Sequence, residues 1–558
     1  MTPILKGFVD ASHGQVHFRY GGRGPVVVML HDCPRSSVLH VPNIEWLGEH
    51  FTVIALDTPG CGNSAPLPQA VPEIADFADA LAKTLDALGI ERCALYGLHA
   101  GAKIALQFAA DHPERAALTI LDGLALSSQP PAPDFLQQYL VPCEPAADGS
   151  HLVAQWSKVL DLHRWFPWFA RSAATRIAFE LPDDLDLQEY AADLFMAGRH
   201  WTSACGAALR HLAGPTIPRL RSRTVFMGRE DDLLYPFLDA LPRPLPPACS
   251  VERIPPQTPA WRTRLLELLR QAELPRAQWR LPAPGPAGST DDERQSYVDL
   301  VHGQVRVRRR GRGGVPILLL HDVPGGSCAL RPLAEALGRD RLTIAPDLPG
   351  LGESHPLPYP SLGSYVTALA ELLDSLDCGV VDVFAEGLGT CFAVALAAHH
   401  PQRVRRLALD GLPLVRSRER RLYARHYCPP LVPDRYGTHL VRIWQQMRDA
   451  EASWPWFDRS AAAVRKHDPE LDPGLMQARL VEIMKHLASY GDAARAALEA
   501  AVRDIVKGIR QPVLLLDGAG DARYAGTRRA ARYLADARTE TRPSAVGARA
   551  ETLREFFG

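Results

Sequence analysis

Short apolar runs and stretches with helical spacing alternate along this sequence, and the alternation occurs twice. Val26–Leu30 is an unbroken run of β-branched and aliphatic residues, too short for a helix and typical of a strand buried on both faces of a parallel sheet. Ile74–Leu88 instead has its apolar residues at helical spacing. Ile317–Leu320 and Tyr365–Leu376 repeat the two patterns in the second half. Alternating strands and helices predict an open α/β sheet with right-handed crossovers.

Sequence matches recur at a nearly constant offset through both halves. Leu-Asp-Gly-Leu at 121–124 returns at 409–412, and Pro-Trp-Phe-x-Arg-Ser at 167–172 returns at 455–460, each 288 residues further on. An offset that holds over a whole half indicates a duplicated domain. The duplication and a stretch rich in Pro, Gly and Ser between the halves predict three segments: a first domain at 1–274, a linker at 275–295 and a second domain at 296–558.

Two loop motifs occur in each half in the same order. His-Asp-Cys-Pro at 31–34 and His-Asp-Val-Pro at 321–324 follow an early strand, and Gly-Arg-Glu-Asp at 228–231 and Gly-Ala-Gly-Asp at 518–521 follow a late one. They resemble the oxyanion loop and the acid-bearing loop of α/β hydrolases. The resemblance covers nearly the whole chain and implies two tandem α/β-hydrolase domains, each a mostly parallel sheet flanked by helices. It also implies a helical lid in each domain, at about 130–212 and 418–505.

The residues at the expected catalytic positions depart from this family. Its hydrolases use a Ser on a sharp strand-to-helix turn, a His that takes the Ser proton and an Asp that orients the His. The turn here holds His99 in the first half and Gly387 in the second. The base is expected after the acid loop, but no His occurs between Asp231 and His302, and none follows His486. The sequence therefore predicts that neither half is a serine hydrolase.

Three residues are candidates for any remaining catalysis. His99 could act as a base or a covalent nucleophile, and its side chain could approach Asp231 directly. Alternatively, His99 only fills the space that the Ser has left. Asp231 and Asp521 could be general acid/base carboxylates whose pKa rises in an apolar pocket, or could only cap the turn that follows.

Further candidates lie on the loops around the two expected clefts. Asp32 and Asp322 replace the Gly that is usual in the oxyanion loop, and they either face the pocket as acids or accept hydrogen bonds from backbone N–H groups. Cys33 is a candidate thiol nucleophile, although no neighbouring base can be named. Glu386, beside Gly387, places a second carboxyl near the second cleft.

Large aromatic side chains gather in both predicted lids. Over a cavity they suit an apolar or aromatic ligand, and alternatively they pack the lid helices on the sheet. A histidine in the shared Gly-[Ser/Thr]-His-Leu-Val segment could bind a ligand carbonyl or carboxylate, or could lock the lid. The candidate ligand-binding residues are Trp156, Trp168 and His151 in the first lid and Trp444, Trp456 and His439 in the second.

Composition narrows the classes of partner. Lys and Arg together number 62 against 63 Asp and Glu, so the chain lacks the basic excess of a nucleic-acid binder. The beginning of the sequence resembles no secretory signal, and the apolar runs are too short to span a bilayer. The ten Cys are spread singly without a metal-ligand rhythm. We therefore expect a cytoplasmic protein without a metal, a cofactor, or a nucleic-acid or membrane partner.

Two functions are compatible with these observations. The first is a degenerate tandem hydrolase that binds a small hydrophobic or aromatic molecule, or a partner protein. The second is a non-hydrolytic enzyme, such as a lyase, isomerase or cyclase of a biosynthetic pathway, that uses His99, Asp231 or the shape of its pocket.

The duplication also predicts that the two halves form an intramolecular pseudo-dimer about a pseudo-two-fold axis. NMR relaxation should then report one rotational correlation time for both halves. Halves that tumble independently would contradict this prediction.

Overall fold

The chain forms two compact units. The computed structural model describes residues 3–275, 279–281 and 293–558. The first unit comprises Met1–Glu144 and Ala154–Gly285, and the second comprises Pro145–Val153 and Pro286–Gly558. The segment Pro145–Val153, expected in the first lid, thus groups with the second unit. Most of the predicted linker at 275–295 lies outside the described residues.

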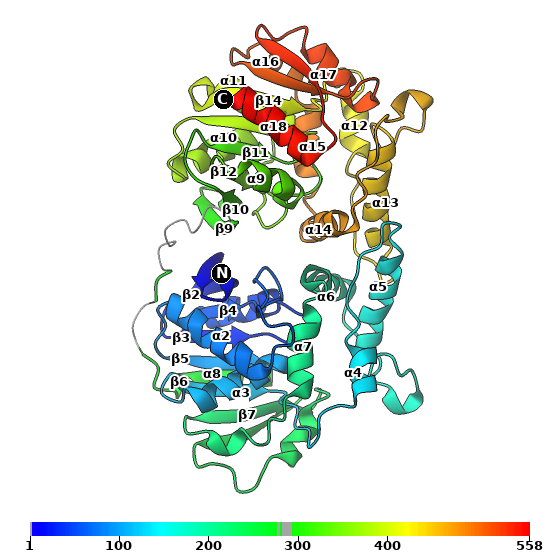
Figure 1. Ribbon diagram of the computed structural model, residues 1–558. Coiled ribbons are helices and arrows are strands. Elements are labelled where there is room, and N and C mark those ends of the chain that lie inside the picture. The colour runs from blue at the N-terminus through cyan, green and yellow to red at the C-terminus, as the bar shows by residue number, and fades with distance from the viewer. Residues whose placement is uncertain (1–2, 276–278, 282–292) are drawn as a thin grey trace. The chain divides into compact units, whose positions relative to one another are not determined.

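The first unit is built on an eight-stranded sheet with the order β1-β2-β4-β3-β5-β6-β7-β8 (Figure 1). β2 pairs antiparallel with β1 and β4, and all other neighbours are parallel. The sheet is therefore mostly parallel, as predicted. Its strands are β1 (Ile4–Ala11), β2 (Gly14–Gly22), β3 (Val26–Leu30), β4 (Thr52–Leu56), β5 (Cys93–Leu98), β6 (Ala116–Asp122), β7 (Thr224–Arg229) and β8 (Cys249–Ile254).

Helices cover both faces of this sheet, and the period of two along each strand assigns its side chains to the faces. In β3, Val27 and Met29 belong to the apolar cluster shared with α1 and α8. Val28 and Leu30 belong to the cluster shared with α2 and α3. This explains why a central strand is apolar at every position. The helices are α1 (Val41–Leu47), α2 (Ile74–Ala87), α3 (Ala100–Asp111) and α8 (Thr258–Arg270).

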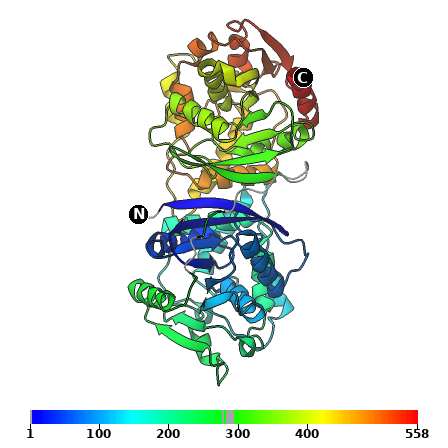
Figure 2. The same cartoon turned by 90° about the vertical axis from the view of Figure 1, so that its left-hand side faces the viewer.

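The second unit repeats this architecture in the order β9-β10-β12-β11-β13-β14-β15-β16. Helices lie around its sheet in both views (Figures 1 and 2). Only the pairs that involve β10 are antiparallel. The strands are β9 (Arg294–Leu300), β10 (Gly303–Arg310), β11 (Ile317–Leu320), β12 (Thr343–Pro346), β13 (Val381–Glu386), β14 (Val404–Asp410), β15 (Val513–Asp517) and β16 (Ala537–Thr541). The flanking helices are α9 (Arg331–Leu337), α10 (Leu362–Ser375), α11 (Gly389–His399), α17 (Ala525–Ala530) and α18 (Val546–Phe557).

A set of helices follows the sixth strand of each sheet, at the positions where lids are predicted. Between β6 and β7 lie α4 (Pro133–Tyr139), α5 (Ser150–Leu162), α6 (Asp184–Ala197) and α7 (Trp201–Arg210). Between β14 and β15 lie α12 (Arg420–His426), α13 (Thr438–Ala452), α14 (Pro473–Met484), α15 (Asp492–Glu499) and α16 (Val502–Val506). That these helices act as lids stays a prediction. Within the described residues, we find no helix with the length and apolarity needed to cross a membrane.

A buried aspartate at the end of the fourth strand of each sheet ties several loops together. Asp57 accepts hydrogen bonds from the backbone N–H of Ser37 and Asn63 and pairs with His17 at 2.7 Å. In the second unit an arginine replaces this histidine. Arg306 Nε lies 2.7 Å from Asp347 and its Nη2 lies 3.0 Å from Glu482, and all three side chains are at most 5 % exposed.

Candidate functional site

His99 occupies a strained strand-to-helix turn between β5 and α3. Its backbone has φ 48° and ψ −104°, a left-handed region that L-residues other than Gly rarely adopt. The turn is tightly packed on both sides: a Cβ at Gly97 would lie 2.4 Å from the Gly101 oxygen, and one at Gly101 would lie 2.5 Å from the Leu30 oxygen. This is the geometry that presents a nucleophile in α/β hydrolases.

Gly387 occupies the same turn in the second unit, between β13 and α11. Its φ is 53°, and its backbone N–H donates to the backbone oxygen of Asp410 at 2.9 Å. In the first unit, the backbone N–H of His99 donates in the same way to the backbone oxygen of Asp122 at 2.9 Å. A Cβ at Gly387 would lie 2.0 Å from Asp322 Cγ. The carboxylate of Asp322 therefore fills the space that a side chain at the turn would need.

The two oxyanion-loop aspartates accept backbone hydrogen bonds at the position of an oxyanion hole. In this fold that hole is formed by the N–H after the nucleophile and an N–H of the oxyanion loop. Asp322 Oδ1 accepts from Leu388 N and Val323 N, both at 2.8 Å. The corresponding bonds to Asp32 Oδ1 come from Cys33 N at 2.7 Å and, more weakly, from the residue after His99 at 3.4 Å. Both aspartates thus make the backbone bonds of the second alternative, and Asp322 also lines a pocket, as the first alternative required.

The imidazole of His99 lies between two carboxylates. Its Nδ1 is 3.2 Å from Asp32 Oδ2 and its Nε2 is 2.8 Å from Asp232 Oδ2, and 29 % of the side chain is exposed. Burial opposes the charged ring, but Asp32 and Asp232 outweigh it and raise the pKa of His99 well above its usual value. Burial would raise the pKa of Asp232, yet the hydrogen bond from His99 leaves that pKa below its usual value. The three groups therefore form a carboxylate–imidazolium–carboxylate cluster.

A direct approach of His99 to Asp231 was expected. The carboxylate that contacts His99 instead belongs to the next residue, Asp232. Asp231 instead forms a bidentate ion pair with Arg229, with N–O distances of 2.9 and 2.5 Å. Consecutive side chains on a loop point in different directions, so a shift of one residue decides which carboxylate faces the turn. Asp521 in the second unit is buried and accepts the backbone N–H of Arg523, so it caps the following turn.

An arginine provides the cation of the second site. Arg523 Nη2 lies 3.2 Å from Asp322 Oδ2. Both units thus pair the oxyanion-loop aspartate with a cation, which comes from the turn itself in the first unit and from the loop after β15 in the second. Another arginine, Arg542, lies in the loop where the family places its catalytic histidine and donates to Asp410 at 2.8 Å.

A pocket of about 490 Å³ opens beside His99 in the first unit. We call it the His99 pocket; its walls include His99, Tyr96, Leu98, Leu233, Trp261 and Arg262. The volume lies in the range of small-molecule sites. Asp122 also lines this pocket; Tyr96 and Trp261 both donate to its carboxyl, and burial raises the pKa of that carboxyl.

The second unit has a smaller pocket of about 170 Å³ next to its turn. Asp322 and Glu386 line it, and burial followed by the charge of Asp410 raises the pKa of Glu386. We call it the arginine pocket after the five arginines in its wall, which are Arg465, Arg479, Arg523, Arg542 and Arg549.

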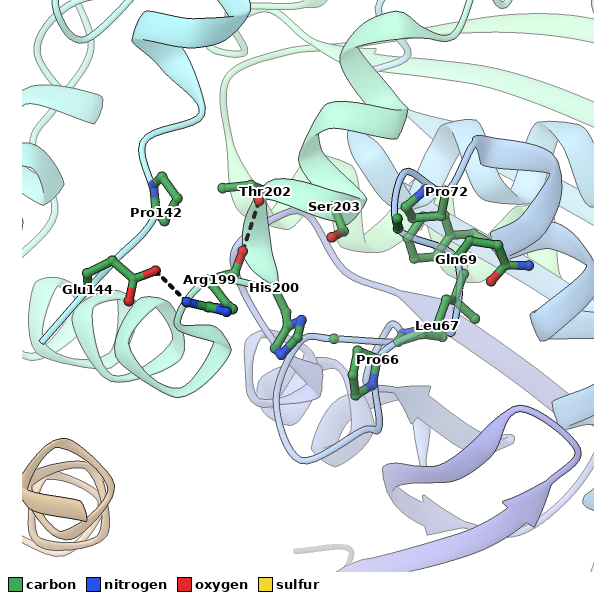
Figure 3. A pocket seen from close by; sticks show the side chains of 14 residues that line it. Pro66, Leu67, Gln69, Pro72, Pro142, Glu144, Arg199, His200, Thr202 and Ser203 are labelled. Atoms are coloured by element: carbon green, nitrogen blue, oxygen red, sulfur yellow. Dashed lines mark hydrogen bonds and ion pairs between the residues drawn. The ribbon is translucent and has the colours of Figure 1, made fainter. Parts of the chain in front are cut away.

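A third pocket, of about 470 Å³, lies between the loop after β4 and the start of α7 in the first unit (Figure 3). Figure 3 shows His200 beside Pro66 and Leu67, and Arg199 paired with Glu144 at 3.2 Å. This pocket contains none of the residues that the sequence selected as site candidates.

The aromatic candidates are held by hydrogen bonds to backbone oxygens or are buried. Trp156 is buried, and Trp168 donates to Tyr139 O at 3.3 Å. Trp444 donates to Ala147 O at 3.2 Å and Trp456 to Tyr427 O at 2.9 Å. None of these four indoles lines the three pockets described above. That they bind a ligand stays a prediction.

The two candidate histidines are also occupied by contacts within the chain. His151, in the segment that groups with the second unit, lies 2.9 Å from Gln477 Oε1 and packs against Trp444. The ring of His439 is buried and accepts the N–H of Asp434 at 3.4 Å. Neither lines the three pockets.

The thiol of Cys33 is poorly suited to act as a nucleophile. A hydrogen bond with the Cys61 thiol and burial raise the pKa of Cys33 well above its usual value. Because the thiolate is the reactive form, this environment keeps Cys33 in its inert, protonated state at neutral pH.

Sequence reasoning missed several residues of both sites. Asp122 and Asp410 lie in the repeated Leu-Asp-Gly-Leu segment, which by itself indicates only the duplication. In the structure these two residues end β6 and β14, beside the turns. Asp232 follows Asp231 directly, and the Asp-Asp pair itself was the available signal. Nothing in the sequence around Arg523 indicated its role.

Comparison with known proteins agrees with this architecture. The family model of the alpha/beta hydrolase fold matches residues 25–161 and again residues 315–436. Together with the two equivalent sheets, these matches show that the chain belongs to the α/β-hydrolase fold superfamily and contains two tandem domains of it.

Curated relatives match short segments. Over 104 residues the chain is 36 % identical to 2-hydroxy-6-oxo-2,4-heptadienoate hydrolase of Pseudomonas putida. This aligned segment covers 18 % of this chain and 37 % of that protein. Over 109 residues it is 33 % identical to the dihydrolipoyllysine-residue acetyltransferase component of the acetoin cleaving system of Cupriavidus necator, covering 19 % and 29 %. The chain thus spans less than half the length of these relatives.

Among solved structures, the enol-lactonase from Burkholderia xenovorans LB400 is similar in fold to part of this chain. The alignment covers 47 % of this chain and 100 % of the lactonase chain, with 18 % sequence identity and a TM-score of 0.37. E-2-(acetamidomethylene)succinate hydrolase is similar to 48 % of this chain over 98 % of its own, with 20 % identity and a TM-score of 0.37.

Proposed function

We propose that this chain is a tandem pseudo-hydrolase, which lacks the Ser-His-Asp triad in both halves and binds a small hydrophobic or aromatic molecule instead of hydrolysing it. The observation that carries the proposal is the carboxylate bound to the oxyanion-hole N–H groups in each half, from Asp32 and Asp322. Acyl transfer needs these donors for the oxyanion of the tetrahedral intermediate. A carboxylate in that position blocks them and repels the developing negative charge.

The residues at the two turns support the same conclusion. Gly387 offers no side chain. His99 offers an imidazolium whose two nitrogens both face carboxylates, so neither nitrogen has the free lone pair that a base or nucleophile needs.

The walls of the His99 pocket support an aromatic or apolar ligand. Tyr96, Leu98 and Trp261 supply apolar surface. The charged groups in the same wall are His99, Arg229, Arg262, Asp122, Asp231 and Asp232. The pocket volume of about 490 Å³ suits a small molecule.

A non-hydrolytic enzyme is the second candidate, and one observation favours it. His99 and Asp232 both line the His99 pocket, so the proton that His99 Nε2 shares with Asp232 lies at the wall of the site. An imidazolium can serve as a general acid in a lyase or isomerase without any acyl-enzyme.

Absence of serine chemistry is directly testable. We expect that a fluorophosphonate probe will not label the chain and that p-nitrophenyl butyrate will give no burst or enzymatic turnover, because the oxyanion donors are occupied. A known serine esterase serves as the positive control. Labelling, or turnover that persists in His99→Ala and Cys33→Ala variants, would contradict the proposal.

Ligand binding is testable with a neutral aromatic probe. We expect 2-naphthol to bind in equilibrium dialysis, and Leu233→Trp to weaken this binding about tenfold or more, because the indole fills the pocket. The matched control is Val71→Trp at an exposed site outside the pocket, which should bind as the parent does. Equal binding by both variants would show that the probe does not occupy the His99 pocket. Conversion of bound substrate analogues in the same assay would favour the enzyme.

A further inference from the structure

Three arginines of the arginine pocket contain a buried donor without an acceptor. The Nε–H groups of Arg465, Arg523 and Arg549 have no hydrogen-bond partner among the described residues. The side chains of Arg465 and Arg549 are only 5 % and 6 % exposed. Buried polar groups are nearly always hydrogen-bonded, so three such donors in the wall of one cavity need an explanation.

The carboxylates nearby satisfy these arginines only in part. Arg523 reaches Asp322 at 3.2 Å, and Arg549 reaches Glu470 at 3.5 Å, in both cases through Nη2. Arg465 Nε lies 3.5 Å from Asp521 Oδ2, but the two groups do not form a hydrogen bond. Each guanidinium therefore keeps donor capacity on its Nε side.

Five arginines and five carboxyl groups line this pocket, and the acids are Asp322, Glu386, Glu451, Glu470 and Asp472. Burial and then repulsion by Arg523 lower the pKa of Arg465. Burial raises the pKa of Glu386, which favours its neutral form and leaves the arginines without that counter-charge.

Part of the pocket wall is apolar. It is formed by the residues Leu330, Leu333, Leu475, Met447, Met476 and Val546. With a volume of about 170 Å³, the pocket is smaller than the usual sites for drug-sized ligands. Charged and apolar side chains therefore line the same small cavity.

We propose that the arginine pocket binds a small organic monocarboxylate, whose carboxylate is held by Arg465, Arg523 and Arg549 and whose apolar body lies against the leucine and methionine wall. A planar carboxylate matches the fork of a guanidinium and accepts two N–H bonds at once. Glu451, Glu470 and Asp472 also line the pocket and would repel a ligand with several negative charges.

This assignment deepens the proposed function, because it names the ligand class of the second half. The carboxylate assignment and the proposed function can be refuted independently. Carboxylate binding is read by calorimetry in the absence of any ester, whereas hydrolysis is read by the fluorophosphonate probe.

The test is calorimetric titration of the full chain with benzoate, with benzamide as the neutral isostere and with inorganic phosphate as the alternative anion. We expect benzoate to bind and the other two to bind about tenfold more weakly or worse. Arg549→Gln should weaken benzoate binding about tenfold or more, since it removes a charged donor. The matched control is Arg554→Gln on the same helix α18, where the side chain pairs with Asp340 outside the pocket.

A second variant avoids any change in the buried charges. Leu475 is 44 % exposed at the pocket wall, and Leu475→Trp should weaken benzoate binding by filling the cavity while the fold is retained. Equal binding of benzamide or phosphate would overturn the assignment, as would a failure of benzoate to bind at millimolar concentration. Unchanged binding by both Arg549→Gln and Leu475→Trp would place the ligand elsewhere.

Discussion

Replacement of Arg306 by Met should destabilise the second unit by about 3–5 kcal/mol, because it leaves two buried carboxylates without their cation. Asp347 and Glu482 both bind this guanidinium and are nearly inaccessible to water. Burial would raise the pKa of Asp347, but Arg306 holds it well below its usual range, which shows how strongly the pair is coupled. Urea titration read by pulse proteolysis reports the two units separately.

The first unit provides an internal control for this variant. It contains its own pair, His17 with Asp57, and its unfolding midpoint should not change. Replacement of the exposed Arg418 by Met should alter neither unit by more than about 0.5 kcal/mol. A second unit of unchanged stability in the Arg306 variant would show that the buried network contributes nothing net.

The second large effect concerns His99 and depends on pH. Because its folded-state pKa is raised, its contribution to stability is fully present below the unfolded pKa of about 6.5 and is lost as pH rises through the folded pKa. His99→Gln should therefore cost about 1–3 kcal/mol near pH 6, where Asp32 and Asp232 lose their cation. The deficit should shrink at alkaline pH, where the parent ring is neutral as well.

Two measurements check this prediction. Urea titrations of the first unit near pH 6 and at alkaline pH give the stability difference, and an NMR titration of the imidazole nitrogens gives the pKa directly. Replacement of the exposed His426 by Gln should have little effect at either pH. A deficit that does not vary with pH, or a ring that titrates at its ordinary pKa, would exclude the ion-paired imidazolium.

Local sequence patterns determined much of the fold because they depend on neighbouring residues alone. The strands predicted at Val26–Leu30 and Ile317–Leu320 have the same bounds in the structure. The helix predicted from Ile74 to Leu88 ends one residue earlier. The hairpin of β1 and β2 was not predicted, although Val16, Phe18 and Tyr20 in β2 alternate with polar residues and offered the signal.

The same reasoning predicted only part of the candidate site. The identity of the two turn residues follows from the motif, and the structure places both in the left-handed conformation that the turn requires. Whether Asp32 faces the pocket or binds the backbone could not be decided from its sequence position. The choice between Asp231 and Asp232 depends on the path of a single loop, which no periodicity encodes.

By itself, the sequence determined that this protein contains a duplicated α/β-hydrolase domain whose turns hold His and Gly. Only the tertiary structure decided that carboxylates occupy the oxyanion donors and that His99 lies between Asp32 and Asp232. These partners are 67 and 133 residues from His99 along the chain, and they meet because the carboxyl ends of parallel strands converge at one edge of the sheet. Side-chain contacts across that edge depend on the positions of several loops at once, whereas the strands and helices themselves depend mainly on residues close in sequence.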